Sequence, residues 1–139
     1  MILLDTSGLL AALAPDQREH AACAAVLARE SGPFVLSPFV LAELDDLLTK
    51  LLGSPAALRL LEEVARGAYS LAPFAAGDVA RAKEVIEQHP KLAIGLADAS
   101  LVVLSERHGT LRLLSLDDRH LRSVRGAGGK RFSLLPRDS

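Results

Sequence analysis

Short apolar runs alternate along this chain with longer segments in which apolar residues recur every three or four positions. The first run ends abruptly at the carboxylate of Asp5. Runs of three to five residues bounded by Gly, Pro, Ser or Asp are typical of short strands buried in a sheet. We therefore expect five strands, at Ile2–Leu4, Phe34–Leu36, Tyr69–Leu71, Leu111–Leu114 and Arg131–Leu135.

The segments between these strands carry helix periodicity and signals of helix ends. Ser37 before Pro38 is a typical helix start, with serine as the N-cap and proline at the first helical position. His89 before Pro90, and Gly109, are typical of helix ends. We expect helices at 9–13, with the hydroxyls of Thr6 and Ser7 as caps, and at 17–29, 38–52, 54–66, 75–89, 96–107 and 117–124. Such alternation predicts one α/β domain over residues 1–139, with a mostly parallel sheet covered on both faces.

The composition adds limits on size and location. A chain of 139 residues, 50% of them hydrophobic, can bury a single continuous core. No stretch approaches the roughly 18 consecutive apolar residues of a membrane span, and the apolar run after Met1 is too short for a secretory signal. The one cysteine, Cys23, lies in an alanine-rich helical segment, so we expect a packing role and a reducing cytoplasm.

The formal net charge of -1 conceals a difference between the two parts of the chain. Residues 1–106 carry 8 Lys and Arg against 14 Asp and Glu, whereas residues 107–139 carry 8 against 3. The basic tail contains Arg119, Arg122, Arg125, Lys130 and Arg131. These side chains either neutralise phosphates on one face of the fold or form an ordinary solvated surface.

Two carboxylates follow expected strands directly. Asp5 ends the first strand, and Asp117 follows the fourth strand through Ser115 and Leu116. Ligand sites of parallel sheets lie outside the carboxyl ends of the strands, so both acids should meet at one edge if the two strands are neighbours. Asp118 is an alternative to Asp117, but counting from the strand favours Asp117.

Two further acids lie on expected helices. Asp98 is embedded in an apolar helix, with Ile94 and Leu101 among its neighbours at three and four positions. An unpaired buried charge is costly, so Asp98 should have a cation or strong donor beside it, unless it only caps a helix that begins near Gly95. Glu43 lies at the border of an apolar stripe, and periodicity alone favours a surface position for it.

Carboxylates that converge at a strand edge repel one another unless divalent cations compensate their charge. All-oxygen ligation suits Mg²⁺ or Mn²⁺ and argues against zinc. We interpret the histidines as surface or packing residues, because no two of them form a short ligand pair: His20, His89, His108 and His120. Acidic clusters with bound metal ions are typical of phosphodiester hydrolysis.

Four fragments in a fixed order make these acids more specific. They are Leu3-Leu-Asp-Thr-Ser-Gly-Leu-Leu10, Leu41-Ala-Glu-Leu44, Gly95-Leu-Ala-Asp-Ala99 and Leu114-Ser-Leu-Asp-Asp-Arg-His-Leu121. Together they resemble the PIN-domain ribonucleases of the VapC toxin type, over essentially the whole chain. The family often has threonine where Ser115 stands and phenylalanine where Leu121 stands, and both differences keep the chemistry.

The resemblance implies a PIN-like three-layer α/β/α domain with about five strands. It also implies an acidic quartet, Asp5, Glu43, Asp98 and Asp117, as catalytic residues and ligands of Mg²⁺ or Mn²⁺, which raises Glu43 from a surface residue to a site residue. Candidate substrate-binding residues are Thr6, Ser115, Arg119 and Arg122.

The implied activity is metal-dependent hydrolysis of RNA by an endonuclease, the toxin of a toxin–antitoxin pair. The implied partners are RNA, a small antitoxin protein and a second copy of the chain, and such partners can form a larger toxin–antitoxin assembly. The alternatives are a housekeeping RNA-processing nuclease and a non-catalytic PIN-like module that binds RNA or protein. A haloacid-dehalogenase-like phosphohydrolase is disfavoured, because it needs an aspartate where Ser7 stands.

Overall fold

A five-stranded sheet forms the centre of the protein. The computed structural model describes residues 1–139, and all neighbouring strands are parallel, in the order β3-β2-β1-β4-β5. The strands are β1 (Ile2–Leu4), β2 (Phe34–Leu36), β3 (Ser70–Leu71), β4 (Arg112–Leu114) and β5 (Ser133–Leu135). The five expected strands are thus confirmed, and the sheet is wholly parallel.

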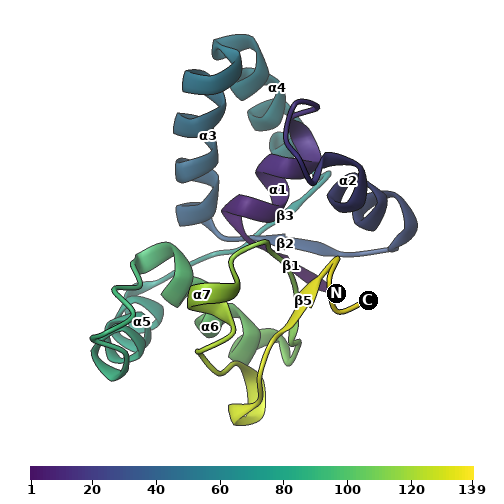
Figure 1. The fold of residues 1–139 in the computed structure, drawn as a ribbon. Helices are drawn as coiled ribbons and strands as arrows, with labels where there is room; N and C mark the ends of the chain where they lie inside the picture. Colours follow the sequence, from purple (N-terminus) through teal and green to yellow (C-terminus); the bar gives the residue numbers. More distant parts are fainter.

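Helices cover both faces of this sheet and make the three-layer α/β/α arrangement. They are α1 (Thr6–Leu13), α2 (His20–Arg29), α3 (Pro38–Leu52), α4 (Ser54–Ala65), α5 (Ala76–Gln88), α6 (Leu96–His108) and α7 (Asp118–Leu121), with a 3₁₀ turn, η1 (Ala127–Gly129). Figure 1 shows α1 to α4 on one side of the sheet and α5 and α6 on the other. Right-handed crossovers explain this division, because the chain first adds strands outward from β1 to β3 and then returns past β1 to β4.

One hydrophobic core joins the two helical layers through the sheet. It contains 33 buried residues, from Ile2 to Leu135. Residues 99–105 of α6 are all buried, which makes this helix the central support of its layer. Cys23 is fully buried, which confirms its packing role. None of the helices combines the length and the apolar character that a membrane crossing requires.

Several element ends differ from the sequence-based prediction. The first helix begins at Thr6, three residues early, and its N-cap is Asp5. The second begins at His20, because backbone bonds from Gln17 N–H to Ala14 O and from His20 N–H to Gln17 O form turns before it. The helix predicted at 117–124 ends at Leu121. The last strand begins late, because Arg131 forms an isolated antiparallel bridge to residue 125.

Gly8 allows α1 to pack directly on the end of β4. A Cβ atom at this position would lie 2.4 Å from the carbonyl oxygen of Leu114, and real contacts are never that short. The same oxygen accepts the backbone N–H of Asp5 at 3.0 Å. A side chain at position 8 would therefore push α1 away from β4 and disturb the hydrogen bond from Asp5 N–H to Leu114 O.

We predict that Gly8→Ala lowers the free energy of unfolding by at least about 2 kcal/mol, because the methyl group overpacks a rigid backbone contact. Gly77→Ala is the matched control: Gly77 also lies in a helix, and a Cβ there meets nothing within 4 Å. That variant should be as stable as the original or up to about 1 kcal/mol more stable. Urea unfolding of both variants measures the difference, and equal stabilities would contradict the close contact.

Candidate active site

Asp5 lies at the point where the order of strands reverses, between β1 and β4. In an open parallel sheet the crevice for a ligand forms at this point. The Asp5 side chain is almost fully buried, with 4% of the residue exposed. Its Oδ2 accepts hydrogen bonds from Ser115 Oγ at 2.7 Å and from Ser7 Oγ at 2.9 Å. Burial raises the pKa of Asp5, and the bonds from Ser115 and Ser7 oppose this rise.

The hydroxyls of Thr6 and Ser7 do not cap α1, contrary to the prediction. Thr6 Oγ1 donates to Glu43 Oε1 at 2.6 Å, and Ser7 Oγ donates to Asp5 while accepting the backbone N–H of Leu116 at 3.0 Å. Both hydroxyls donate hydrogen bonds to carboxylates instead, and the residue at the N-cap position is Asp5. Thr6 thereby links Glu43, which is exposed on α3, to the end of β1.

A buried pair of serines connects the two helices that carry the remaining acids. Ser37 is the N-cap of α3, as predicted, and accepts the N–H of Phe39. Its Oγ lies 2.7 Å from Ser100 Oγ on α6. Because Ser100 donates its own proton to Ala97 O, Ser37 is the donor of this pair. The bond fixes the start of α3, which carries Glu43, against the start of α6, which carries Asp98.

Asp98 is the third residue of α6, and only 19% of its side chain is exposed. The N-cap of α6 is Gly95, and no side chain caps this helix start, so capping does not explain Asp98. Burial, as the largest cause, and then the charges of Asp5, Asp117 and Glu43 raise the pKa of Asp98 to about 6, whereas His120 opposes this rise. The four predicted acids therefore lie within electrostatic reach of one another.

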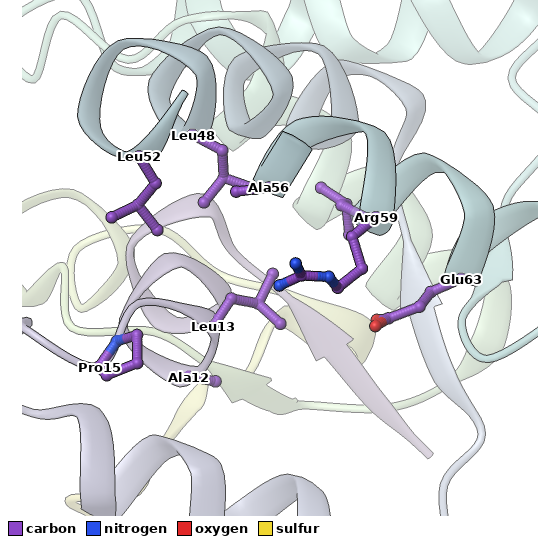
Figure 2. Close-up of a pocket in the computed structure, with 9 residues that line it drawn as sticks. Ala12, Leu13, Pro15, Leu48, Leu52, Ala56, Arg59 and Glu63 are labelled. Carbon is purple, nitrogen blue, oxygen red and sulfur yellow. The ribbon is translucent and has the colours of Figure 1, made fainter. Parts of the chain in front are cut away.

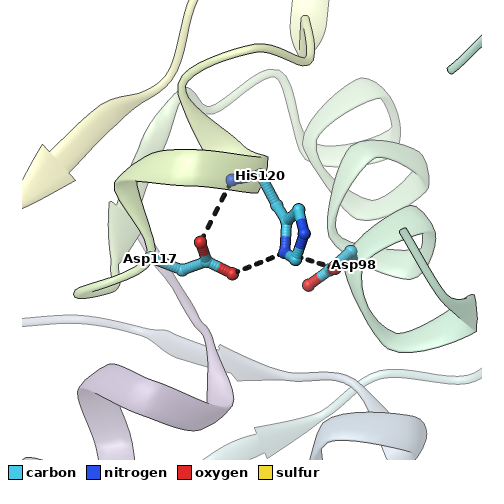
Figure 3. Close-up of side chains that lie close together, drawn as sticks. All are labelled: Asp98, Asp117 and His120. Carbon is cyan, nitrogen blue, oxygen red and sulfur yellow. Dashed lines mark hydrogen bonds and ion pairs between the residues drawn. The ribbon is translucent and has the colours of Figure 1, made fainter. Parts of the chain in front are cut away.

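Asp117 is the N-cap of α7, and both of its oxygens face His120. Oδ1 accepts the backbone N–H of His120 at 3.0 Å, and Oδ2 lies 3.0 Å from His120 Nδ1. The same Nδ1 is 3.7 Å from Asp98 Oδ2. Figure 3 shows the ring between the two carboxylates. The interpretation of His120 as a surface or packing residue is thus wrong.

The sequence did contain a signal for His120. A residue three positions after a helix N-cap lies on the same face as the cap, and His120 stands three positions after Asp117. Spacings between histidines do not reveal His120, because its partner in the chain is a carboxylate.

Asp118 lies away from this group. Its carboxylate pairs with Arg122 and with Arg137, whereas Asp117 faces Asp98. Arg122 also binds Asp138 through both terminal nitrogens, at 2.6 and 2.8 Å. Of the predicted substrate-binding residues, Arg122 is therefore engaged within the protein, while Arg119 is exposed on α7.

The group of acids fits a divalent cation. No lysine or arginine forms an ion pair with any of the four acids, and the one basic group within 4 Å of Asp98 and Asp117 is His120. One ligand atom each from Asp98, Asp117 and His120 lies within 4.8 Å of the others. Carboxylate oxygens that are not paired with a lysine or arginine are suitable ligands for Mg²⁺ and Mn²⁺. The residues present therefore suit such an ion.

The fold and the acids at its switch point define a PIN domain. Residues 2–126 match the PIN domain family, and the chain belongs to this family. It is 38% identical over 135 residues to ribonuclease VapC26 of Mycobacterium tuberculosis, which covers 97% of this chain and 100% of that protein. The resemblance seen in the four sequence fragments is confirmed.

Solved structures show the same fold. The crystal structure of Mycobacterium tuberculosis VapC20, described as a toxin that cleaves the sarcin-ricin loop, aligns with a TM-score of 0.79 and 19% identity over 85% of this chain and 91% of that chain. The complex VapBC2 of Rickettsia felis, bound to a DNA fragment from its promoter, aligns with a TM-score of 0.67 and 17% identity over 96% and 98%. The predicted three-layer architecture is confirmed.

We predict that the metal-free protein loses stability as the pH rises. Between about pH 4 and pH 6 the folded state keeps a proton on Asp98 that the unfolded chain releases, because the pKa of Asp98 is about 6 when folded and ordinarily 3.8. The free energy of unfolding therefore falls through this window, by at most about 3 kcal/mol for the single group. Asp98→Asn removes this loss, so the variant should be more stable than the original at pH 7.5 and equal to it near pH 4.

Thermal unfolding in a chelator across this pH range tests the prediction. Asp16→Asn is the control, since Asp16 is exposed in the turn before α2, and it should leave the pH profile unchanged. An Asp98→Asn profile parallel to that of the original chain would contradict a repulsive site.

Proposed function

We propose that the protein is a metal-dependent endoribonuclease that hydrolyses RNA phosphodiester bonds, and that it is the toxin of a toxin–antitoxin pair. The observation that carries this proposal is the convergence of four carboxylates without a lysine or arginine partner. Burial and, after it, the charges of the other three acids raise the pKa of Asp98. The 38% identity to ribonuclease VapC26 supports the activity.

The proposed ligands of Mg²⁺ or Mn²⁺ are Asp5, Asp98 and Asp117, with Glu43 as a further ligand or as the group that orients the attacking water. A bound divalent ion lowers the pKa of its water and stabilises the leaving oxygen of the phosphodiester. Ser7 and Ser115 donate hydrogen bonds to the same oxygen of Asp5 and so fix the orientation of this carboxylate. Thr6 holds Glu43 in the same way.

Phosphate contacts come from the surface around these acids. Arg119 is exposed on α7, two residues after Asp117, and remains our first candidate for a phosphate contact. Thr6 and Ser115 are better described as positioning residues, since each already bonds an acid. Arg122 is a weaker candidate, because a phosphate would have to displace Asp138 from it.

Two alternatives differ from this proposal in measurable ways. A non-catalytic PIN-like module would bind RNA without cutting it, and the four intact acids argue against that. A housekeeping RNA-processing nuclease would have the same site but no antitoxin. The VapC name of the 38% identical ribonuclease, together with the description of VapC20 as a toxin, favours a toxin over this second alternative.

We predict that Asp98→Asn reduces Mn²⁺-dependent cleavage of a synthetic RNA hairpin by at least about 100-fold, because a direct ligand matters at least as much as its supporting shell. Asp45→Asn on α3 is the matched control and should cleave normally. Chelation should stop the original enzyme, and Mn²⁺ or Mg²⁺ should restore it, which separates its activity from that of metal-independent contaminating nucleases. Cleavage retained by Asp98→Asn would rule out the proposed quartet.

The proposed antitoxin has a candidate docking surface between α1, α3 and α4. A cavity of about 300 Å³ opens there, lined by Ala12, Leu13, Pro15, Leu48, Leu52, Ala56, Arg59, Leu60 and Glu63. Figure 2 shows apolar side chains around most of it and the charged ends of Arg59 and Glu63 on one side. Nearby Leu58 is 62% exposed and Leu51 54%. Exposed apolar surface of this kind suits an apolar segment of a partner protein, and the solved VapBC2 complex supports a partner.

We predict that Leu52→Glu prevents the chain from co-purifying with the small protein encoded by the adjacent reading frame, because a charge then faces the cavity. Val79→Glu on α5 is the matched control, since Val79 is similarly exposed but lies away from the cavity. Co-expression followed by affinity purification gives the result. Thermal unfolding of both variants should stay unchanged, and equal co-purification would place the partner elsewhere.

A homodimer and a cytoplasmic location remain our predictions. The exposed leucines of α3 and α4 suit either a second copy or the antitoxin. An RNA substrate and a buried free cysteine both favour the cytoplasm. Light scattering of the purified chain decides the oligomeric state.

A further inference from the structure

His120 is placed to do more than support its own helix. Its backbone N–H already satisfies Asp117 Oδ1, so the cap of α7 does not require the imidazole ring. The ring instead points its Nδ1 at Oδ2 of Asp117 and towards Oδ2 of Asp98, at 3.0 and 3.7 Å. Figure 3 shows that these three side chains come from two elements, α6 and the start of α7, and converge on one point.

The spacing of these atoms is that of neighbouring ligands on one ion. Two ligands bonded to a cation at about 2.1 Å and at right angles lie about 3 Å apart. The two Nδ1 distances, 3.0 and 3.7 Å, are close to this separation. A carboxylate and a histidine three positions apart on a helix also form a recurrent metal-binding pair in helical carboxylate proteins. About a quarter of the His120 side chain is exposed, 27%, so an ion can reach it from solvent.

We infer that His120 is a ligand of the metal ion held by Asp98 and Asp117, and that it makes this site prefer Mn²⁺ or Co²⁺ to Mg²⁺. The inference rests on the proposed function, in that it assumes a divalent ion among the acids. Mg²⁺ is a hard ion that takes oxygen ligands, whereas nitrogen ligands bind more tightly to the later first-row ions. Replacing one oxygen donor by an imidazole therefore moves the preference away from Mg²⁺.

Two other roles of His120 give different results. As an orienting residue, it would only hold Asp117 in place, and no nitrogen would touch the ion. As a counter-charge, a protonated ring would occupy the place of the ion, and its removal would make metal binding tighter.

The deciding experiment is pulsed EPR of the Mn²⁺-bound protein at pH 8, together with calorimetric titration of Mn²⁺, Co²⁺ and Mg²⁺. The original chain should show the coupling of a directly bonded ¹⁴N nucleus, and His120→Ala should lose it. The variant should bind Mn²⁺ and Co²⁺ at least about tenfold more weakly, with a smaller loss for Mg²⁺. His108→Ala, at the exposed end of α6, is the control and should match the original chain.

The inference is overturned if Mn²⁺ binds without nitrogen coupling, which would leave an orienting role, or if His120→Ala binds Mn²⁺ as tightly as the original chain or more tightly. A failure of the proposed function looks different. In that case the original chain binds none of the three ions, and RNA cleavage does not depend on them.

Discussion

The pairing of β1 with β4 is the contact on which the candidate site depends. It brings Ser115 to within 2.7 Å of Asp5, although the two residues are 110 positions apart in the chain. The backbone N–H of Asp5 extends the ladder to Leu114 O. Because the strand order reverses at this pair, the connecting helices leave to opposite faces of the sheet. The carboxyl ends of the two strands are therefore left open, and acids from α3, α6 and α7 surround them.

The same arrangement makes the site costly for the folded chain. Hydroxyl groups hold Asp5 and Glu43, and no lysine or arginine neutralises either of them. Hydroxyls orient a carboxylate without removing its charge, so the repulsion among the acids persists and adds to the effect of burial in raising the pKa of Asp98. A site that needed only stability would contain a lysine or arginine here. The lack of either supports the proposal that a divalent cation compensates the charge.

Much of this could be predicted from the sequence, because it depends on local pattern. Alternating strands and helices determine the layers, the ends of two strands locate Asp5 and Asp117, and an acid in an apolar helix reveals Asp98. Glu43 was different, since it is exposed and periodicity cannot distinguish a site at the surface from ordinary surface. Only the resemblance to a family identified it.

The errors have a common physical cause. Thr6 and Ser7 were assigned to the helix that follows them, but the fold brings other partners to them: the side chains of Glu43 and Ser115 and the backbone N–H of Leu116. His120 was judged without the tertiary contact to Asp98. Hydroxyl and imidazole groups satisfy whichever partner the tertiary structure brings close, so rules based on neighbours in sequence assign them poorly.

Arginine and leucine residues of the basic tail hold the short helix α7 in place. Helix α7 has only four residues, too few to be stable alone, yet Asp117 and His120 both depend on its position. Buried Leu121 and the bidentate pair of Arg122 with Asp138 attach it to the end of the sheet, where Asp138 also accepts the N–H of Leu134. A partly exposed pair adds little to stability, on the order of 1 kcal/mol or less, but its fixed fork geometry sets the orientation of the helix. Arg122 therefore influences Asp117 and His120 through the position of α7, whereas Arg119 on the same helix is exposed.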